Sequence, residues 1–232
     1  MKTALLSILT IFITLLNPYS TEMKLVFKNK GVTISTNSSY EVLKFNPTHF
    51  EFGVSEGKPT NSDFYINSNF FYKGGEPMGM VIVDGNKKYG KRKNGGSFYV
   101  KDGKPYVRSK YCPSSTDYCS QSVFWGIDDG ELNHRGIKEN HATLNRLRTL
   151  IGQNKKGEII LIVSKIRLDA KTILEFGTEY DLVDAVFCDG GTSVDYYFNI
   201  DGYTSTFKAL SDGMKTILGI DQPPVYISGN LK

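Results

Sequence analysis

The pattern of apolar and polar positions along this chain is mainly that of short β-strands separated by turns rich in glycine. Short apolar runs bounded by Gly, Asn, Asp and Ser are typical of strands. The runs that predict strands lie at residues 25–27, 32–34, 80–83, 98–100, 149–152, 158–163, 183–187 and 196–198. Two of them, 149–152 and 158–163, flank a turn at 154–157 and predict a β-hairpin.

One segment has a helical pattern. Asp169 or Thr172 can cap a helix over residues 170–175, or slightly beyond, in which Ile173 and Leu174 form an apolar side. Because this helix stands between two predicted strands, the passage is similar to a βαβ unit within an otherwise antiparallel pattern. We therefore expect an α+β protein, a single domain with a large mixed, mostly antiparallel β-sheet and a few packed helices.

The composition fits one globular domain, since 40% of the 232 residues are hydrophobic and 12% are aromatic. The net charge of +4 is small and spread along the chain. It therefore favours anionic ligands only weakly, and we expect no nucleic-acid partner.

The N-terminal residues indicate export. Lys2 precedes an apolar run over residues 4–16, which is short for a membrane span but suits a signal peptide. We predict a signal peptide at 1–20, a mature domain at 21–232, and a secreted, periplasmic or cell-envelope location. No stable membrane anchor is expected after cleavage, and an uncleaved segment that stays as an anchor is the alternative.

The three cysteines divide into a pair and a single residue. Cys112 and Cys119 flank a short stretch of turn-forming residues and can close it with a disulfide outside a reducing cytosol. Cys188 is then left over on an apolar run, where a free cysteine usually behaves as a small buried hydrophobe. A nucleophilic Cys188 would need a nearby base, and no histidine is adjacent in sequence.

An acid stands where an apolar strand meets two consecutive glycines. Asp189 would project from the carboxyl end of that strand, while Gly190 and Gly191 allow a positive φ and the close approach of a ligand. The N–H groups of this turn, with the hydroxyls of Thr192 and Ser193, can converge on an anion. The alternative is an ordinary Asp-Gly turn between two strands.

Two further groups of residues suit a sugar phosphate. Asn67 and Asn69 can donate and accept hydrogen bonds, as sugar hydroxyls require, with turn formation as the alternative. Phe71 can form the wall of a sugar site or fill the core. Arg146 and Arg148 alternate on one face of a predicted strand and can grip a phosphate, unless both simply face solvent.

Taken in order, these stretches resemble the phosphodiester glycosidase family. The resemblance runs from about residue 61 to about residue 220, and the ordered set of motifs is more specific than any one of them. The motifs are Asn-Ser-Asn-Phe-Phe at 67–71, Pro-Met-Gly at 77–79, Arg-Thr-Leu-Ile-Gly at 148–152 and Asp-Gly-Gly-Thr-Ser at 189–193. Ser68 and Thr192 stand where the family has glycine, and the segment at Gln121 fits the family only in part. These departures bear on substrate preference.

The resemblance implies an exported glycosidase that hydrolyses a sugar-1-phosphodiester at the anomeric carbon and releases the sugar and a phosphomonoester. Its substrate would be a phosphoglycan, such as an exopolysaccharide, or a smaller sugar phosphate. Asp189 would act as base toward water, as nucleophile or as stabiliser of the oxocarbenium ion, and Arg148 would stabilise the departing phosphate. The substrate-binding residues that it implies are Asn67, Asn69, Phe71, Gly79, Gln121, Arg146, Gly190, Gly191, Thr192 and Ser193.

Several alternatives stay open at this point. The candidates for a second catalytic group are Asp84, Asp128, Asp129, Glu131, His134 and His141. No cofactor is expected, although Asp189 and another acid could hold a hard divalent cation. The alternative function is a non-catalytic carbohydrate-binding or envelope polysaccharide assembly protein. A cysteine or metal hydrolase is a third possibility, against which the lack of an HExxH motif argues.

Overall fold

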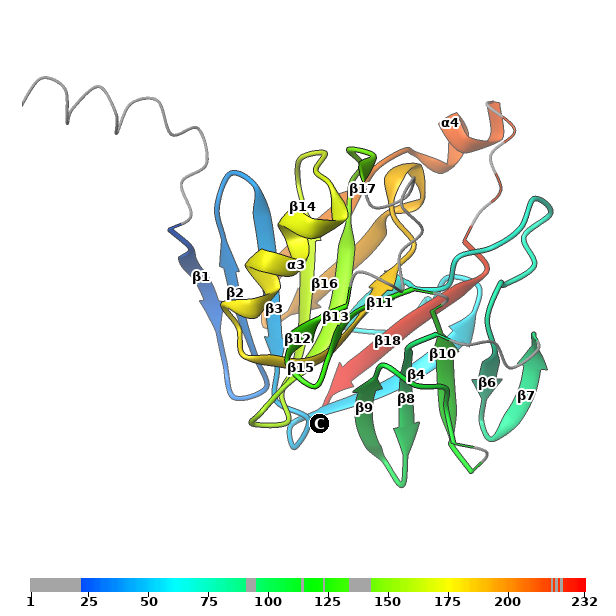
Figure 1. Cartoon of the computed structure of the whole chain (residues 1–232), viewed down its shortest axis with the longest axis horizontal. Coiled ribbons are helices and arrows are strands. Elements are labelled where there is room, and N and C mark those ends of the chain that lie inside the picture. Colours follow the sequence, from blue (N-terminus) through cyan, green and yellow to red (C-terminus); the bar gives the residue numbers. More distant parts are fainter. Residues whose placement is uncertain are drawn as a thin grey trace, which may run out of the picture.

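The protein is built from three antiparallel β-sheets (Figure 1). The computed structural model describes residues 22–90, 95–113, 115–122, 124–133, 143–217, 219, 221 and 223–232. Strands make up 50% of the described residues and helices 9%, so the predicted α+β class with a few packed helices is wrong and the fold is mostly β. The predicted signal peptide at 1–20 lies outside the described residues. None of the helices in the described part of the chain has the length and the hydrophobicity of a membrane span.

The largest sheet has eight strands, and each of the other two has five. In spatial order, the eight-stranded sheet contains β1 (Lys24–Lys28), β2 (Val32–Thr36), β3 (Tyr40–Phe45), β14 (Ile159–Ser164), β13 (Thr149–Asn154), β15 (Leu182–Cys188), β11 (Trp125–Asp128) and β12 (Glu131–Leu132). The second sheet, called the β16 sheet, contains β17 (Tyr203–Lys208), β16 (Asp195–Ile200), β5 (Phe64–Asn67), β18 (Val225–Leu231) and β4 (Phe50–Glu56). The third sheet, called the β10 sheet, contains β7 (Asn86–Tyr89), β6 (Val81–Val83), β10 (Tyr118–Gln121), β8 (Ser97–Lys101) and β9 (Lys104–Arg108).

The predicted mixed sheet is also wrong, because the strand–helix–strand passage does not form a parallel pair. β14 leads into helix α3 (Ala170–Thr178), and the chain returns to the sheet as β15. β14 and β15 run in the same direction, yet β13 lies between them and is antiparallel to both. The three sheets are consequently antiparallel throughout the part of the chain that the structure describes.

The predicted hairpin is confirmed as β13 and β14, which pair from Thr149 with Val163 to Gln153 with Ile159. Both strands are buried on both faces. Ile162 packs toward α3, whereas Leu161 on the opposite face joins the main core. This two-sided burial explains why the sequence shows a continuous apolar run there instead of an alternating one.

Helix α3 covers the outer face of the eight-stranded sheet (Figure 1). The N–H of Thr172 donates to the carboxylate of Asp169 at 2.7 Å and caps the helix, as the sequence predicts. The helix ends at Thr178, slightly beyond residue 175 as predicted, and a Cβ on Gly177 would lie only 3.2 Å from the side chain of Leu150. A second described helix, α4 (Asp212–Ile217), has no counterpart among the predicted elements.

The main core lies where the inner faces of the three sheets meet. Phe45 stands at its centre, with ring centroids 4.9 Å from Phe50, 5.5 Å from Phe52 and 4.8 Å from Phe64. Rings at these separations and tilted angles pack favourably and fill the space between sheets densely. This core fixes the eight-stranded sheet relative to the β16 sheet.

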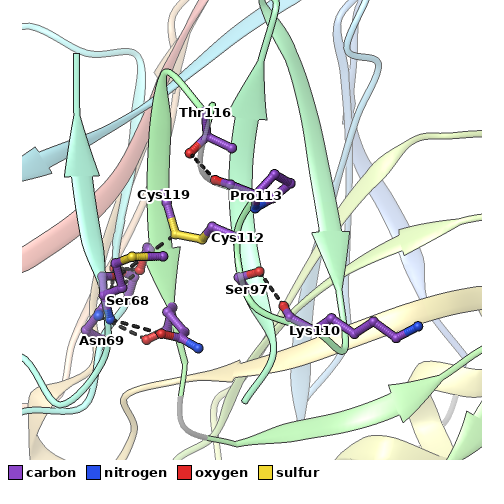
Figure 2. Close-up of a disulfide and its surroundings, with 11 residues drawn as sticks. Ser68, Asn69, Ser97, Lys110, Cys112, Pro113, Thr116 and Cys119 are labelled. Carbon is purple, nitrogen blue, oxygen red and sulfur yellow. Dashed lines mark hydrogen bonds between the residues drawn. A yellow bond between two sulfur atoms is a disulfide. The ribbon is translucent and has the colours of Figure 1, made fainter. Parts of the chain in front are cut away.

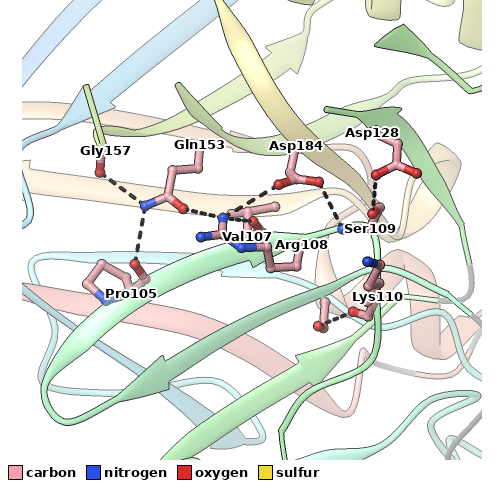
Figure 3. Close-up of polar contacts among 10 residues, drawn as sticks. Pro105, Val107, Arg108, Ser109, Lys110, Asp128, Gln153, Gly157 and Asp184 are labelled. Atoms are coloured by element: carbon pink, nitrogen blue, oxygen red, sulfur yellow. Dashed lines mark hydrogen bonds and ion pairs between the residues drawn. The ribbon is translucent and has the colours of Figure 1, made fainter. Parts of the chain in front are cut away.

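A polar network attaches the β10 sheet to the eight-stranded sheet (Figure 3). Nη1 of Arg108 donates to Oε1 of Gln153 at 2.8 Å and lies 3.5 Å from a carboxylate oxygen of Asp184. The N–H of Ser109 donates to Asp184 at 3.1 Å, and the Ser109 hydroxyl donates to Asp128. Burial raises the pKa of Asp184 above its usual value, while Ser109 and Arg108 act in the opposite direction. The network therefore holds a buried acid in place between two sheets.

The structure joins Cys112 and Cys119 in a disulfide (Figure 2). The two Cα atoms are 6.4 Å apart, and both side chains are buried. Cys119 lies on β10, next to Ser120, whose hydroxyl donates to the hydroxyl of Ser68 at 2.8 Å. The residue next to the disulfide on β10 therefore forms a hydrogen bond with Ser68, which directly follows β5 of the β16 sheet.

Candidate active site

The candidate site is the turn that carries the chain from the eight-stranded sheet into the β16 sheet. β15 ends at Cys188, Asp189 follows, and a 3-10 turn at Gly191–Ser193 leads toward β16. The N–H of Asp189 donates to the carbonyl of Ser68 at 2.9 Å, and the N–H of Ser68 donates to the carbonyl of Val225 at 3.0 Å. Two successive hydrogen bonds therefore tie the acid to β18.

The two glycines of the turn are required by its geometry. A Cβ on Gly190 would lie 2.5 Å from the carbonyl oxygen of Leu147, far inside van der Waals contact. The N–H of Gly191 donates to that same carbonyl at 2.8 Å, and Gly191 has a φ of +64°. The glycines therefore bring the turn against the segment that carries the two arginines.

Asp189 is half-buried, and the donors and cations around its carboxylate do not fully offset the effect of burial on its pKa. It accepts a hydrogen bond from the N–H of Gly190 at 2.9 Å and another from the hydroxyl of Ser193. Burial raises the pKa of Asp189 to about 7, against the opposing effects of these two donors and of Lys215 and Arg146. A carboxyl group with such a pKa can take up a proton near neutral pH, which suits a general base.

Asn67 is buried beneath the turn and holds both of its ends. Its Nδ2 donates to the carbonyl of Asp189 at 3.1 Å, and its Oδ1 accepts from the N–H of Asp195 at 2.9 Å. The side chain therefore positions the acid. Its predicted contact with a sugar stays a prediction.

Asn69, Gln121 and Gly79 form a second buried cluster behind the turn. Nδ2 of Asn69 donates to the carbonyl of Gln121 at 3.0 Å, and Oε1 of Gln121 accepts from the N–H of Met80 at 3.1 Å. A Cβ on Gly79 would lie 2.0 Å from the carbonyl oxygen of Gln121, so only glycine fits this close approach. These contacts are within the protein, and the substrate-binding roles predicted for the three residues stay predictions.

Phe70 and Phe71 have different surroundings. The ring of Phe70 packs edge-on against Phe124, with centroids 4.8 Å apart, at the margin of the core beneath α3. Phe71 is half-buried, and its main chain forms an isolated bridge with Pro77. Phe71 is therefore the member of the pair that lies away from the described core clusters, and its predicted role as a sugar-binding wall stays open to experiment.

The two arginines point to different partners. The guanidinium of Arg148 donates to the carbonyls of Leu144 at 2.6 Å and Leu168 at 3.3 Å. Burial, with Arg146 nearby, lowers the pKa of Arg148. Arg146 is exposed and is one of the charges that act on the carboxylate of Asp189. Arg146 thus influences the acid through its charge, whereas Arg148 holds the main chain together.

A pocket of about 380 Å³ opens beside the turn. Its lining residues are Arg146, Leu147, Arg167, Gly191, Thr192, Ala209 and Leu210. Two exposed arginines and the exposed Thr192 hydroxyl give it donors for an anion. Arg167 also lines a neighbouring cavity of about 460 Å³ along α3. Arg167 could not be identified from the sequence, because it follows the buried strand β14 and belongs to no recognisable motif.

The predicted second acids do not gather at the turn. Asp128 shares Ser109 with Asp184 near the start of β15, whereas Asp189 follows the end of that strand. Asp84 accepts a hydrogen bond from the hydroxyl of Tyr118 at 2.6 Å on the β10 sheet. Asp129 and Glu131 are exposed. His134 and His141 lie outside the described residues.

The described residues contain no group of three or more His, Cys, Asp or Glu side chains that could hold a metal ion. Cys188 is buried, and burial raises the pKa of its thiol above its usual value. A buried thiol that keeps its proton is a poor nucleophile.

A mostly antiparallel β-fold that presents an acid of raised pKa beside exposed arginines has the features of an enzyme for an anionic substrate. The chain belongs to the phosphodiester glycosidase family, whose model matches residues 60–220, more than half of the sequence. No curated protein matches the chain.

Two solved structures are similar to this one in fold. The catalytic domain of zebrafish N-acetylglucosamine-1-phosphodiester alpha-N-acetylglucosaminidase, auto-inhibited by its pro-peptide, has a TM-score of 0.59 and 14% identity over 91% of this chain and 82% of that one. A hypothetical protein from Synechocystis has a TM-score of 0.68 and 12% identity over 91% of this chain and 64% of that one. The family and the fold indicate a glycosidase-type function, and the family implies a sugar-phosphodiester substrate.

Proposed function

We propose that this protein is an exported glycosidase that hydrolyses a sugar-1-phosphodiester at its anomeric carbon and releases the sugar and a phosphomonoester. The observation that carries the proposal is the position of Asp189, a carboxyl with a pKa of about 7, beside a pocket lined by Arg146 and Arg167. The donors suit a phosphate, and the acid suits proton transfer at neutral pH.

The proposed reaction does not require a strong general acid. A phosphate is a far better leaving group than a sugar alkoxide, so the bond between the anomeric carbon and the phosphate oxygen can break without protonation of that oxygen. The electron pair leaves with the phosphate, where Arg146 and Arg167 stabilise the charge. The oxygen of a water molecule bonds to the anomeric carbon, and its proton passes to Asp189. One well-placed carboxylate therefore suffices for this route.

Arg148 supports this arrangement from outside the reacting atoms. Its guanidinium donates to the carbonyls of both Leu144 and Leu168, and the backbone N–H of Arg148 donates to the hydroxyl of Ser164 at 2.6 Å. These bonds fix the segment on which Arg146 stands. In this proposal Arg148 is a positioning residue, and Arg146 takes the place at the phosphate.

Export is part of the proposal. The apolar run at 4–16 suits a signal peptide, and the Cys112–Cys119 disulfide suits an oxidising compartment. In this proposal, a location outside the cytosol brings the enzyme to phosphoglycans of the cell envelope.

The test compares the mature protein with its Asp189→Asn variant on a panel of sugar-1-phosphodiesters, with free sugar and phosphomonoester followed by NMR. Asp102→Asn is the matched control, because Asp102 is exposed in a turn with a φ of 52° that asparagine tolerates. We expect turnover in the wild type and in Asp102→Asn, loss of turnover in Asp189→Asn, and inversion at the anomeric carbon. A retained anomer would assign Asp189 as nucleophile, and glycan binding without turnover of any substrate would refute the enzyme in favour of a binding protein.

A further inference from the structure

A second cavity, which we call the α3 cavity, runs along helix α3 next to the pocket beside the turn. Its volume of about 460 Å³ is within the range of small-molecule sites in proteins. The reaction proposed above uses only one of its lining residues, Arg167. The function of the remaining lining is therefore open to inference.

The apolar part of the lining is held in place by the core beneath α3. The rings of Tyr40 and Phe176 stack in parallel, with centroids 3.9 Å apart and an interplanar angle of 6°. Both of these residues and Leu168 are buried, and Ile166 is half-buried beside them. Because the core already orders these side chains, a ligand that packs on them does not have to order them on binding.

The polar part of the lining changes along α3. Arg167 precedes the N-terminal end of the helix, whereas Glu175 and Glu179 are exposed on its last turn and at its C-cap. The carboxylate of Asp169, near Arg167, is engaged in capping the helix. The 9 residues of α3, at about 1.5 Å each, separate its two ends by about 13 Å. The far end of the cavity therefore presents carboxylates and the negative end of the helix dipole, which disfavour an anion and accept hydrogen bonds from hydroxyl groups.

The α3 cavity adjoins the pocket beside the turn. Arg167 lines both spaces. Arg146, which lines the pocket, and Leu168, which lines the α3 cavity, form an antiparallel bridge with two N–H to carbonyl hydrogen bonds of 3.0 Å. The turn at residues 189–193, which is described in full, contributes two residues to the lining of the pocket and none to that of the α3 cavity. The pocket with its arginines therefore lies between the acid of the turn and the α3 cavity.

We propose that the α3 cavity binds the aglycone, the group on the far side of the phosphate from the hydrolysed sugar, and that it selects a polyhydroxylated aglycone without a further negative charge. The inference rests on the proposed function for the position of the phosphate. The order of groups along the surface then matches the order along the substrate: the anomeric carbon at Asp189, the phosphate at Arg146 and Arg167, and the aglycone along α3. The C–H groups of a polyol or sugar ring pack on the apolar lining, and its hydroxyls donate to Glu175 and Glu179.

The test measures binding of phosphomonoesters, the products that keep the aglycone, by calorimetry and without turnover. The probes are methyl phosphate, glucose 6-phosphate and 6-phosphogluconate, which add to the phosphate a methyl group, a neutral sugar and a polyol with a carboxylate. Burial of about 60 Å² of apolar surface corresponds to about a tenfold gain in affinity. Glucose 6-phosphate should therefore bind the wild type at least about tenfold more tightly than methyl phosphate, and more tightly than 6-phosphogluconate.

Thr172→Trp tests the cavity by filling it, and Lys171→Trp is the matched control. Thr172 is exposed and lines the α3 cavity, whereas Lys171 is its neighbour on α3, has a side chain that is 66% exposed and does not line the cavity. In Thr172→Trp the Kd of glucose 6-phosphate should rise about tenfold, toward that of methyl phosphate, whose own Kd should not change. Lys171→Trp should bind both probes as the wild type does.

A double variant, Glu175→Gln with Glu179→Gln, tests the selection against charge. Glutamine keeps the size and a hydrogen-bond acceptor of each side chain but removes its charge. The ratio of the 6-phosphogluconate Kd to the glucose 6-phosphate Kd should fall by at least about threefold, because two like charges no longer act on the carboxylate of the probe. Glu131→Gln is the control, since Glu131 is exposed on β12 and does not line the α3 cavity.

The outcomes separate this inference from the proposed function. Equal affinity of the wild type for methyl phosphate and glucose 6-phosphate, binding of neither, or unchanged glucose 6-phosphate affinity in Thr172→Trp overturns the aglycone site even if sugar phosphodiesters are hydrolysed. If Thr172→Trp does not fold, the double glutamine variant decides: a reduced Kd ratio supports the inference and an unchanged ratio overturns it. Glucose 6-phosphate binding that depends on Thr172, in a protein that turns over no phosphodiester, would sustain the binding site and refute the glycosidase.

Discussion

Replacement of Asp189 by asparagine should make the protein more stable at alkaline pH while it removes the proposed base. The carboxyl has a pKa of about 7 in the folded protein, against an ordinary value of 3.8. An acid whose folded pKa is raised holds its proton more tightly in the folded state. Stability is therefore greatest below the unfolded pKa, and it is lost as the pH rises through the folded pKa.

The size of this loss of stability follows from the difference between the folded and the ordinary pKa of Asp189. Each pKa unit corresponds to about 1.4 kcal/mol, so full ionisation of Asp189 lowers the free energy of unfolding by about 4 kcal/mol. Most of this loss, about 3 kcal/mol, falls between about pH 5 and about pH 8. The Asp189→Asn variant cannot ionise, so its stability advantage over the wild type should grow by that amount across the same interval. The pKa of about 7 already includes the effect of Lys215, which favours the ionised carboxylate.

The assay is urea unfolding of the wild type, Asp189→Asn and the Asp102→Asn control at the ends of this interval, about pH 5 and about pH 8. The quantity of interest is the change with pH in the stability difference between variant and wild type. Asp102→Asn should show no such change. A difference between Asp189→Asn and the wild type that is the same at both pH values would refute the claim that burial of this carboxylate destabilises the fold.

The remaining predictions concern the pH profile and the framework of the site. If Asp189 is the base, kcat/KM should rise with pH to a plateau above about 7, and a flat profile would exclude that role. Gly79→Ala places a Cβ 2.0 Å from a backbone oxygen and should cost about 2–3 kcal/mol in chemical unfolding, whereas an unchanged midpoint would mean that the backbone moves aside. Removal of the Cys112–Cys119 disulfide, with its sequence separation of 7, should cost about 2–3 kcal/mol, and reductant should shift the wild-type midpoint equally. Asn67→Ala leaves two buried backbone groups unpaired and should cost about 2–4 kcal/mol with a loss of activity; full activity would contradict its positioning role.

Local features of the fold could be predicted from the sequence. The hairpin of β13 and β14 is formed by neighbouring segments, and its turn residues stand between two apolar runs. The cap of α3 depends only on Asp169 and the N–H of Thr172, three residues apart. Such contacts are encoded within a few residues, so the pattern alone indicates them.

The order of strands could not be predicted in the same way. A strand, a helix and a second strand usually form a parallel pair, and nothing in β14, α3 or β15 shows that β13 occupies the place between the two strands. The choice depends on the burial of β13 on both faces, which only the whole sheet determines. The expected mixed sheet was wrong for this reason.

The same difference between local and distant contacts explains why only part of the candidate site could be predicted. Asp189 and its glycines form a local signal at the end of a strand, whereas amide side chains such as Asn67 suit a sugar and a buried backbone equally well. The spacing of Arg146 and Arg148 predicted a shared face, but the carbonyls that engage Arg148 come from separate segments. Lys215 lies on a short helix without apolar periodicity, so only the folded structure shows that it is buried.

The position of β18 has a consequence for how the candidate site forms during folding. β18 lies between β4 and β5, and its Val225 carbonyl accepts the hydrogen bond from Ser68 that supports Asp189. Since β4 and β5 come early in the chain and β18 comes late, the β16 sheet closes only through contacts between distant segments, which form slowly. Until residues 225–231 are in place, β4 and β5 each expose an unpaired edge, and the N–H of Ser68 lacks the acceptor that ties the acid to β18. In a refolding experiment, catalytic activity should therefore return with the last kinetic phase, after the β13–β14 hairpin has already formed.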